Sequence, residues 1–164
     1  MSFWHGACNG TSPGRTVATT QPRAGKHILV VDDYADALDI WTIYLQSMGY
    51  QVSSAADGLT AVAKAEQLLP DLVVLDLELP GLTGFEAAKR LRANPDTTQI
   101  PLIAATGYSH ARQLDLARQS GFDAVVVKPC DPDLLVQEIE RLLAADSDET
   151  QARLSGGERP HNNR

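Results

Sequence analysis

The sequence predicts an α/β fold in which five parallel strands alternate with five helices in a doubly wound sandwich. Short apolar runs alternate with amphipathic stretches throughout residues 26–145, and turn residues separate them. Three of the runs are continuously apolar, which is typical of strands buried on both faces of a parallel sheet. A single domain with one central sheet is therefore expected.

Strands are expected wherever a short apolar run ends in turn residues. The run at 72–76, Leu-Val-Val-Leu-Asp, has no polar residue before its last position. The five predicted strands are 27–32, 50–55, 72–76, 102–105 and 124–127.

The first predicted helix begins near Tyr34 and ends before Gly49, a residue suited to the left-handed conformation that follows many helices. Its apolar residues recur at helical spacing and are expected to face the sheet. These residues are Leu38, Trp41, Leu45 and Met48.

The other helices also have recognisable ends. The second is expected to run from Asp57 as N-cap to Leu69, where Pro70 stops it. The third begins at a capping box formed by Thr83 and Glu86.

The fourth helix is predicted from Ser109 to Gly121. The fifth begins with Asp131 as N-cap and Pro132 at the first helical position, and it is expected to fray beyond about Ala145.

Composition indicates one globular domain between two flexible flanks. Residues 1–25 mix Gly, Pro, Ser and Thr without periodicity, and residues 146–164 are polar, so a leader and a tail are expected around a domain at 26–145. No apolar run approaches the roughly 20 residues that span a bilayer. Cys8 and Cys130 do not indicate a disulfide framework, and a cytoplasmic location is expected. The net charge of −7 argues against a nucleic-acid partner.

Four of the five predicted strands deliver a polar residue to one edge of the sheet. Asp32 and Asp33 follow the first strand, Asp76 ends the third, Thr106 follows the fourth and Lys128 follows the fifth. Ligands of open parallel sheets bind at this carboxyl edge. Each residue alone could be a helix cap, a turn hydroxyl or a surface amine, but their joint occurrence predicts a site.

The three aspartates predict a divalent cation at this edge. Carboxylates held together repel one another, which raises the pKa of at least one of them. A dication together with Lys128 would balance their charge. Oxygen ligands favour Mg²⁺, and no histidine or thiolate cluster indicates zinc. Such a site can take up a phosphoryl group, with Asp76 as the carboxylate nucleophile.

Four segments closely resemble the signature segments of response-regulator receiver domains, in the same order and at similar intervals. They are HILVVDDY, PDLVVLDLELPGLTGFE, IPLIAATGY and GFDAVVVKPC. The resemblance covers residues 26–145 and implies a flavodoxin-like, CheY-like sandwich with strand order 2-1-3-4-5.

The resemblance also implies a role for each matching residue. Asp33 would bind Mg²⁺ directly and Asp32 mainly through water, while Asp76 would carry the phosphoryl group and also touch the metal. The backbone carbonyl of Glu78 would be the further metal ligand. Thr106 would hydrogen-bond one phosphoryl oxygen.

Lys128 would pair with another phosphoryl oxygen, and the bond between Lys128 and Pro129 would be cis. The donor would be a phosphohistidine on a sensor histidine kinase or on a histidine phosphotransfer protein. In the family the positions of Glu78 and Tyr108 influence how long the phosphoryl group lasts. Glu78 would repel hydroxide and Tyr108 would cover the acyl phosphate, unless both are solvated loop residues.

Two residues depart from the family pattern. Val125 stands where many relatives have an aromatic residue or histidine whose rotamer reports the position of the threonine, and a β-branched side chain cannot swing a ring. This departure favours a phosphorelay shuttle or phosphate sink with little conformational output. Cys130 replaces a common Phe or Val, and a packing role is expected for it rather than redox chemistry.

The favoured function is a stand-alone receiver domain, a monomer or weak dimer, that signals by protein contact and catalyses only its own phosphorylation and dephosphorylation. An aspartyl-phosphate phosphatase of the haloacid-dehalogenase type is a distant alternative, because it would need Asp-x-Asp where this chain has Asp76-Leu77-Glu78. A flavin binder would need a Ser/Thr/Gly-rich loop after the first strand. A scaffold without chemistry is disfavoured, because the whole constellation is present.

Overall fold

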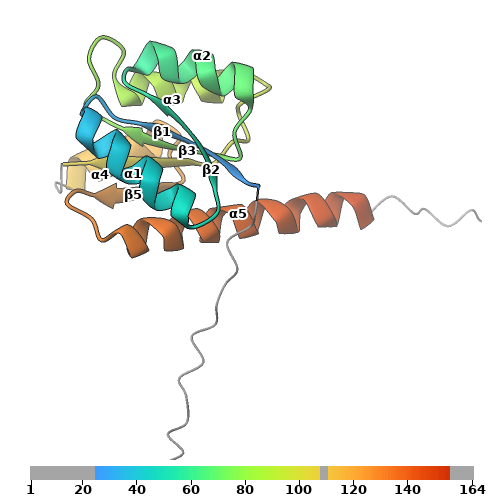
Figure 1. Cartoon of the computed structure of the whole chain (residues 1–164). Helices are drawn as coiled ribbons and strands as arrows, with labels where there is room; N and C mark the ends of the chain where they lie inside the picture. The colour runs from blue at the N-terminus through green and yellow to red at the C-terminus, as the bar shows by residue number, and fades with distance from the viewer. Residues whose placement is uncertain (1–24, 108–110, 156–164) are drawn as a thin grey trace, which may run out of the picture.

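The structure, a computed structural model, describes residues 25–107 and 111–155 and shows one sheet with helices on both faces (Figure 1). The strands are β1 (His27–Val31), β2 (Gln51–Ala55), β3 (Leu72–Asp76), β4 (Leu102–Thr106) and β5 (Ala124–Val127). The helices are α1 (Ala35–Ser47), α2 (Gly58–Leu68), α3 (Gly84–Ala93), α4 (Ala111–Gln119) and α5 (Pro132–Ser155). All strand pairs are parallel, and the order β2-β1-β3-β4-β5 confirms the predicted topology.

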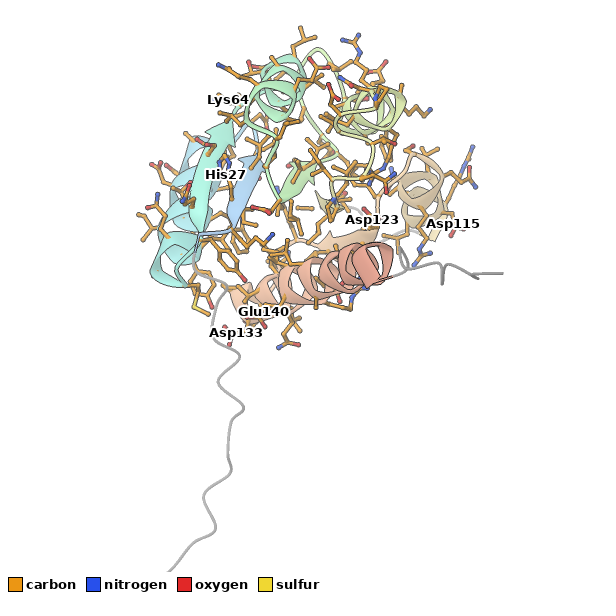
Figure 2. The ribbon with its side chains drawn as sticks, turned by 90° about the vertical axis from the view of Figure 1, so that its right-hand side faces the viewer. His27, Lys64, Asp115, Asp123, Asp133 and Glu140 are labelled. Atoms are coloured by element: carbon orange, nitrogen blue, oxygen red, sulfur yellow. The ribbon has the colours of Figure 1, made fainter. Side chains whose placement is uncertain are left out.

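The central strands are buried on both faces, as their continuous apolar runs predicted. On β3, Val73 and Leu75 pack in the layer under α2, α3 and α4, whereas Leu72 and Val74 pack in the layer under α1 and α5. This division follows from the strand geometry, in which successive side chains point to opposite faces. Figure 2 shows side chains filling the space on both sides of the sheet.

Local sequence signals set several helix ends. Gly49 follows α1 with a φ of 92°, a left-handed conformation that costs glycine little. The Asp57 side chain accepts the Thr60 N–H at the start of α2. Thr83 and Glu86 form the predicted capping box at the start of α3. These three predictions are confirmed.

The end of α5 corrects a prediction. The helix was expected to fray beyond about Ala145, but it continues to Ser155. Polarity alone does not end a helix, and residues 146–155 contain no Gly or Pro before Gly156. The predicted helix start at Ser109 lies outside the described residues, as do residues 1–24 of the predicted leader at 1–25 and residues 156–164 of the predicted tail.

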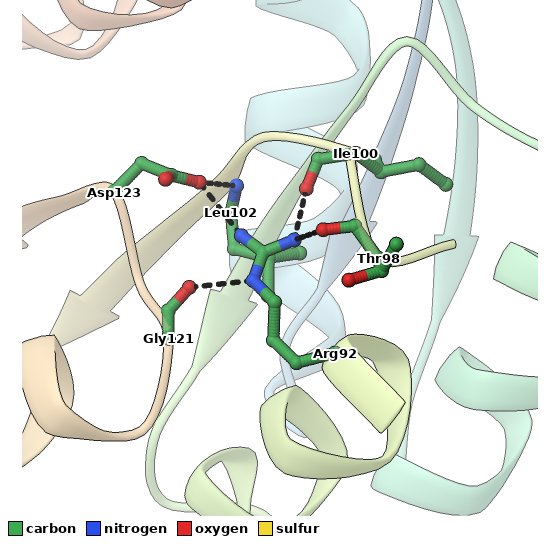
Figure 3. Close-up of polar contacts among 6 residues, drawn as sticks. All are labelled: Arg92, Thr98, Ile100, Leu102, Gly121 and Asp123. Atoms are coloured by element: carbon green, nitrogen blue, oxygen red, sulfur yellow. Dashed lines mark hydrogen bonds and ion pairs between the residues drawn. The ribbon is translucent and has the colours of Figure 1, made fainter. Parts of the chain in front are cut away.

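Arg92 of α3 joins two loops at the amino edge of the sheet (Figure 3). Its guanidinium donates to the carbonyls of Thr98 (2.7 Å), Ile100 (2.7 Å) and Gly121 (2.9 Å) and to the carboxylate of Asp123 (2.7 Å). Asp123 also accepts the N–H of Leu102, the first residue of β4. Arg92 therefore anchors the chain before β4 and before β5.

The edge strand β2 is partly covered by a lysine. Lys64 of α2, labelled in Figure 2, donates its Nζ to the carbonyl of Ser54 at 2.5 Å. Covering an edge carbonyl in this way reduces unwanted strand pairing. Among the described helices, none combines the length and apolar character needed to cross a bilayer.

Candidate functional site: an acidic cluster with a lysine at the carboxyl edge of the sheet

Tertiary folding brings the predicted site residues to one edge of the sheet. Asp32 directly follows β1, Asp76 is the last residue of β3, and Lys128 directly follows β5. Asp76 pairs in register with Ala105, so Thr106, the last residue of β4, lies one position further along the same edge.

Three carboxylates lie close together at this edge. One oxygen each from Asp32, Asp33 and Asp76 lies within 4.8 Å of the others. Asp32 and Asp76 are buried, with 3% and 6% of their surface exposed, whereas Asp33 is exposed. The cluster is therefore open to solvent through Asp33.

Lys128 reaches into the cluster from β5. Its Nζ hydrogen-bonds both Asp32 and Asp76, at 2.7 Å in the case of Asp76 Oδ2. The Lys128 backbone N–H donates to the carbonyl of Thr106 at 2.7 Å, and Thr106 is fully buried. The peptide bond between Lys128 and Pro129 is cis, as predicted. One ammonium is thus shared by two buried carboxylates.

Burial and this sharing shift the titration of the site. Burial raises the pKa of Asp76 and outweighs the hydrogen bonds from Lys128 and from the Glu78 N–H, which act in the opposite direction. Burial alone would lower the pKa of Lys128, but its hydrogen bonds to Asp32 and Asp76 outweigh burial and raise it. Lys128 is therefore held as a cation, while the ionised form of Asp76 is under-compensated.

Two backbone donors complete the cluster, and neither was predicted. The Glu78 N–H donates to Asp76 Oδ1 at 2.8 Å, and the Tyr34 N–H donates to Asp32 Oδ1 at 3.0 Å. The tendency of Asp to bond the N–H two residues on is the signal that would have predicted both contacts. The other oxygen of each carboxylate faces Lys128.

The donor set fits a hard divalent cation. Three carboxylates and one ammonium leave two negative charges in excess, and all three carboxylates offer oxygen, the ligand that Mg²⁺ prefers. Asp33, at the exposed side of the cluster, leaves room for the waters that Mg²⁺ usually retains.

Three further residues singled out from the sequence have the following surroundings in the structure. Glu78 is exposed and reaches toward Gly107, where a Cβ would lie 3.8 Å from Glu78 Oε2. Val125 is half-buried and packs against the core layer under α2, α3 and α4. Cys130 is half-buried in the other layer, where burial raises the pKa of its thiol. Tyr108 lies outside the described residues.

Comparison with known proteins decides the family. Residues 28–140 match the family model of the response regulator receiver domain. The chain belongs to that family. It is a receiver domain of the two-component type, a phosphoaccepting signalling module rather than an enzyme of the ordinary kind.

Curated relatives include regulators and a kinase. The receiver domain is 35% identical over 130 residues to the DNA-binding response regulator MtrA of Mycolicibacterium paratuberculosis, covering 79% of this chain and 56% of the relative. It is 35% identical over 118 residues to the CAI-1 autoinducer sensor kinase/phosphatase CqsS of Vibrio cholerae, covering 71% of this chain and 17% of the relative. The chain thus spans only part of the curated relatives it matches.

Solved structures agree on the fold. A CheY-like receiver domain protein from Methanospirillum hungatei superposes with a TM-score of 0.72 at 29% identity, over 77% of this chain and 99% of that one. The receiver domain of the sensor histidine kinase PA1611 from Pseudomonas aeruginosa, with a magnesium ion coordinated in its active site cleft, gives 0.70 at 30% identity, over 74% and 99%. Mg²⁺ binding at the active site is general to receiver domains, and an acidic cluster is present at the corresponding edge of the sheet here.

Proposed function

We propose that Asp76 accepts a phosphoryl group, in a Mg²⁺-dependent reaction, from a phosphohistidine on a sensor histidine kinase or a histidine phosphotransfer protein. The observation that carries this proposal is the position of Asp76: its carboxylate is buried among Asp32, Asp33 and the ammonium of Lys128. The ionised form of a carboxylate with too little positive charge around it is stabilised when a cation enters together with the phosphoryl group.

The transfer is a nucleophilic displacement at phosphorus. An Asp76 oxygen forms a new P–O bond while the P–N bond of the donor breaks, and the imidazole nitrogen keeps the electron pair and takes a proton from solvent. Lys128, which already bonds Asp76 Oδ2, would donate to one phosphoryl oxygen. Thr106, at the end of the neighbouring strand, would donate to another.

Asp32, Asp33, Asp76 and the backbone carbonyl of Glu78 would hold the Mg²⁺ ion. When bound, the ion supplies positive charge that neutralises the phosphoryl oxygens during transfer. The Glu78 N–H fixes one oxygen of Asp76, so the carboxylate is oriented before the donor arrives.

The phosphoryl lifetime would be set at the mouth of the site. Glu78 is exposed and directed toward Gly107, where its negative charge would repel hydroxide. Tyr108, one residue further, would cover the acyl phosphate. Self-catalysed dephosphorylation would then be slower in the wild type than in a Glu78→Gln variant.

An apolar surface beside Lys128 would receive the phosphodonor protein. It is lined by Ala37, Ile40, Trp41, Lys128, Pro129 and Cys130. Ile40 is 62% exposed, and exposed aliphatic side chains next to a reaction centre are typical of a protein contact. Because Lys128 belongs to both, this surface is continuous with the site, and a helix bearing the phosphohistidine is the occupant that we propose.

The output would be contact with another protein, and the shuttle or sink is the second candidate. Val125, packed against the core layer under α2, α3 and α4, has no ring to move when Thr106 engages the phosphoryl group, which favours little conformational output. Beryllofluoride with Mg²⁺ provides the test. Amide shifts confined to the site would favour the sink, and shifts spreading over α4, β5 and α5 would favour the switch.

Four further expectations stay predictions. They are stand-alone action, a cytoplasmic location, a monomeric or weakly dimeric state and the absence of a nucleic-acid partner.

Incubation with acetyl phosphate and Mg²⁺, followed by intact mass, tests the phosphoacceptor. Wild type is expected to gain one phosphoryl group, Asp76→Asn none, and the control Asp96→Asn, at an exposed position, as much as wild type. No gain by wild type, or equal gain by Asp76→Asn, would refute the proposal. Rapid multiple turnover of acetyl phosphate would instead indicate an aspartyl-phosphate phosphatase.

The docking surface has a separate test. Ile40→Asp is expected to slow transfer from a phosphorylated phosphotransfer protein while leaving acetyl phosphate labelling unchanged. Leu59→Asp, at a similarly exposed position of α2, is the matched control. If Ile40→Asp does not slow transfer, phosphodonor proteins do not use this surface.

A further inference from the structure

The start of α3 lies directly against the backbone of the phosphoacceptor. A Cβ built on Gly84 would lie 2.1 Å from the carbonyl oxygen of Asp76, 2.7 Å from Leu77 Cα and 2.9 Å from the carbonyl carbon of Asp76. Real Cβ contacts essentially never fall below 3.0 Å. The site was predicted without Gly84, although a glycine at the first helical position, directly after an N-cap, was visible in the sequence.

The atoms that oppose a side chain here are backbone atoms. A flexible side-chain end could rotate away, but the Asp76–Leu77 peptide belongs to β3 and to the turn that follows it. The Gly84 N–H also donates to the carbonyl of Leu77 at 3.2 Å. Helix and strand are therefore joined without any side chain between them.

The carboxylate of Asp76 depends on the same stretch of backbone. Its Oδ1 accepts the Glu78 N–H at 2.8 Å, two residues along this chain segment. A shift of residues 76–78 would move the carboxylate relative to Lys128 and to the other two aspartates. The start of α3 is held in turn by the capping box of Thr83 and Glu86.

We propose that Gly84 is a positioning residue for the phosphoryl-transfer site. By carrying no side chain it lets the first residue of α3 rest on the Asp76–Leu77 backbone and thereby fixes the Asp76 carboxylate. This inference rests on the proposed function of Asp76, and it adds a residue that touches neither the metal nor the phosphoryl group.

Gly121 provides a control at the opposite edge of the sheet. It has a φ of 99°, in the left-handed region, and a Cβ there would lie 2.7 Å from Cγ of Arg92. Alanine is therefore strained at this position, but Arg92 lies at the amino edge of the sheet, away from the acidic cluster. Gly121→Ala and Gly84→Ala should both lose stability and differ in their effect on the site.

Three measurements separate positioning from stability: thermal midpoint, Mg²⁺ affinity from tryptophan fluorescence, and the labelling rate with acetyl phosphate. Alanine at Gly84 requires close to an ångström of movement between α3 and the Asp76–Leu77 backbone. Misplacement of a reacting group on that scale costs about 10- to 100-fold in rate or metal affinity. We expect that loss for Gly84→Ala in both affinity and rate. Gly121→Ala should remain within about twofold of wild type in both, although its midpoint also drops.

Wild-type behaviour for Gly84→Ala, or an equal loss for Gly121→Ala, would overturn the positioning role. Labelling of wild type at Asp76 is measured beside them, so failure of the proposed function itself is distinguished. If Gly84→Ala does not fold, a milder pair of variants tests the proposal. Thr83→Ala loosens the start of α3 and should weaken Mg²⁺ binding several-fold, whereas Asp57→Ala removes the equivalent cap of α2 and should not. Equal Mg²⁺ affinity in these two variants would also refute the proposal.

Discussion

The Nζ of Lys128 lies 2.7 Å from Oδ2 of Asp76, although the two residues are 52 positions apart in the chain. The same Nζ hydrogen-bonds Asp32, so a single ammonium serves two buried carboxylates. Three carboxylates with one ammonium leave the cluster short of positive charge, which favours the binding of a cation.

Replacing Lys128 with Met should damage both stability and chemistry. Asp32 and Asp76 would remain buried without their partner, which costs about 2 kcal/mol or more in the free energy of unfolding. Loss of a donor to the phosphoryl oxygen should slow labelling by about 100-fold. Urea unfolding in EDTA and labelling with acetyl phosphate measure the two effects.

Lys64→Met is the control for the Lys128 prediction, because Lys64 donates to a carbonyl on the edge strand away from the cluster. It should label at the wild-type rate. Normal labelling of Lys128→Met would contradict the assigned role of Lys128.

Replacing Asp33 with Asn should change stability in opposite directions with and without Mg²⁺. In EDTA the variant removes one of three mutually repelling carboxylates, which should raise the free energy of unfolding by about 0.5 kcal/mol, since Asp33 is exposed. In saturating Mg²⁺ the wild type should be the more stable protein, because it binds the ion more tightly.

Urea titrations in both conditions test the Asp33 prediction, with Asp39→Asn as an exposed control on α1. Asp39→Asn should respond to Mg²⁺ as wild type does. The same Mg²⁺-induced gain in Asp33→Asn would remove Asp33 from the ligand set.

The N-cap of α2 should contribute stability that depends on pH. Hydrogen bonds from the backbone N–H and the hydroxyl of Thr60 lower the pKa of Asp57. A carboxyl with a lowered folded pKa binds fewer protons in the native state, so its contribution is complete above the unfolded pKa and is lost as pH falls through the folded pKa.

Wild type should therefore exceed Asp57→Ala in free energy of unfolding at pH 7, and the difference should shrink as pH falls below about 4. Urea unfolding of both proteins between pH 7 and pH 3 gives the comparison. A difference that is constant over this range would mean that the charge of Asp57 plays no part in the cap.

Replacing Arg92 with Met should lower stability and leave the chemistry intact. Three carbonyls and the Asp123 carboxylate would lose their donor, at a cost of about 2–3 kcal/mol. Arg92→Lys should recover only part of this loss, because a single ammonium cannot reproduce the planar set of donors. Labelling of the folded fraction should stay within about twofold of wild type. A larger loss would mean that the amino and carboxyl edges of the sheet are energetically coupled.

Local patterns in the sequence were sufficient to predict the strands, most helix ends and the types of residue at the site. Apolar runs located the strands, and the caps at Asp57 and Thr83 located two helix starts, because both signals depend on neighbours within a few positions. The prediction was wrong at the end of α5, because polar residues alone do not end a helix and no Gly or Pro stands between Ala145 and Gly156.

The sequence by itself determined which side chains reach the carboxyl edge, since each of Asp32, Asp76, Thr106 and Lys128 ends or directly follows a strand. Only the tertiary structure decided how they meet: that one ammonium is shared by two carboxylates, and that Gly84 rests on the backbone of Asp76. Contacts of this kind join segments far apart in the chain or need backbone positions accurate to a fraction of an ångström. Neither leaves a periodic signal, because strand and helix patterns record only which face of an element is buried.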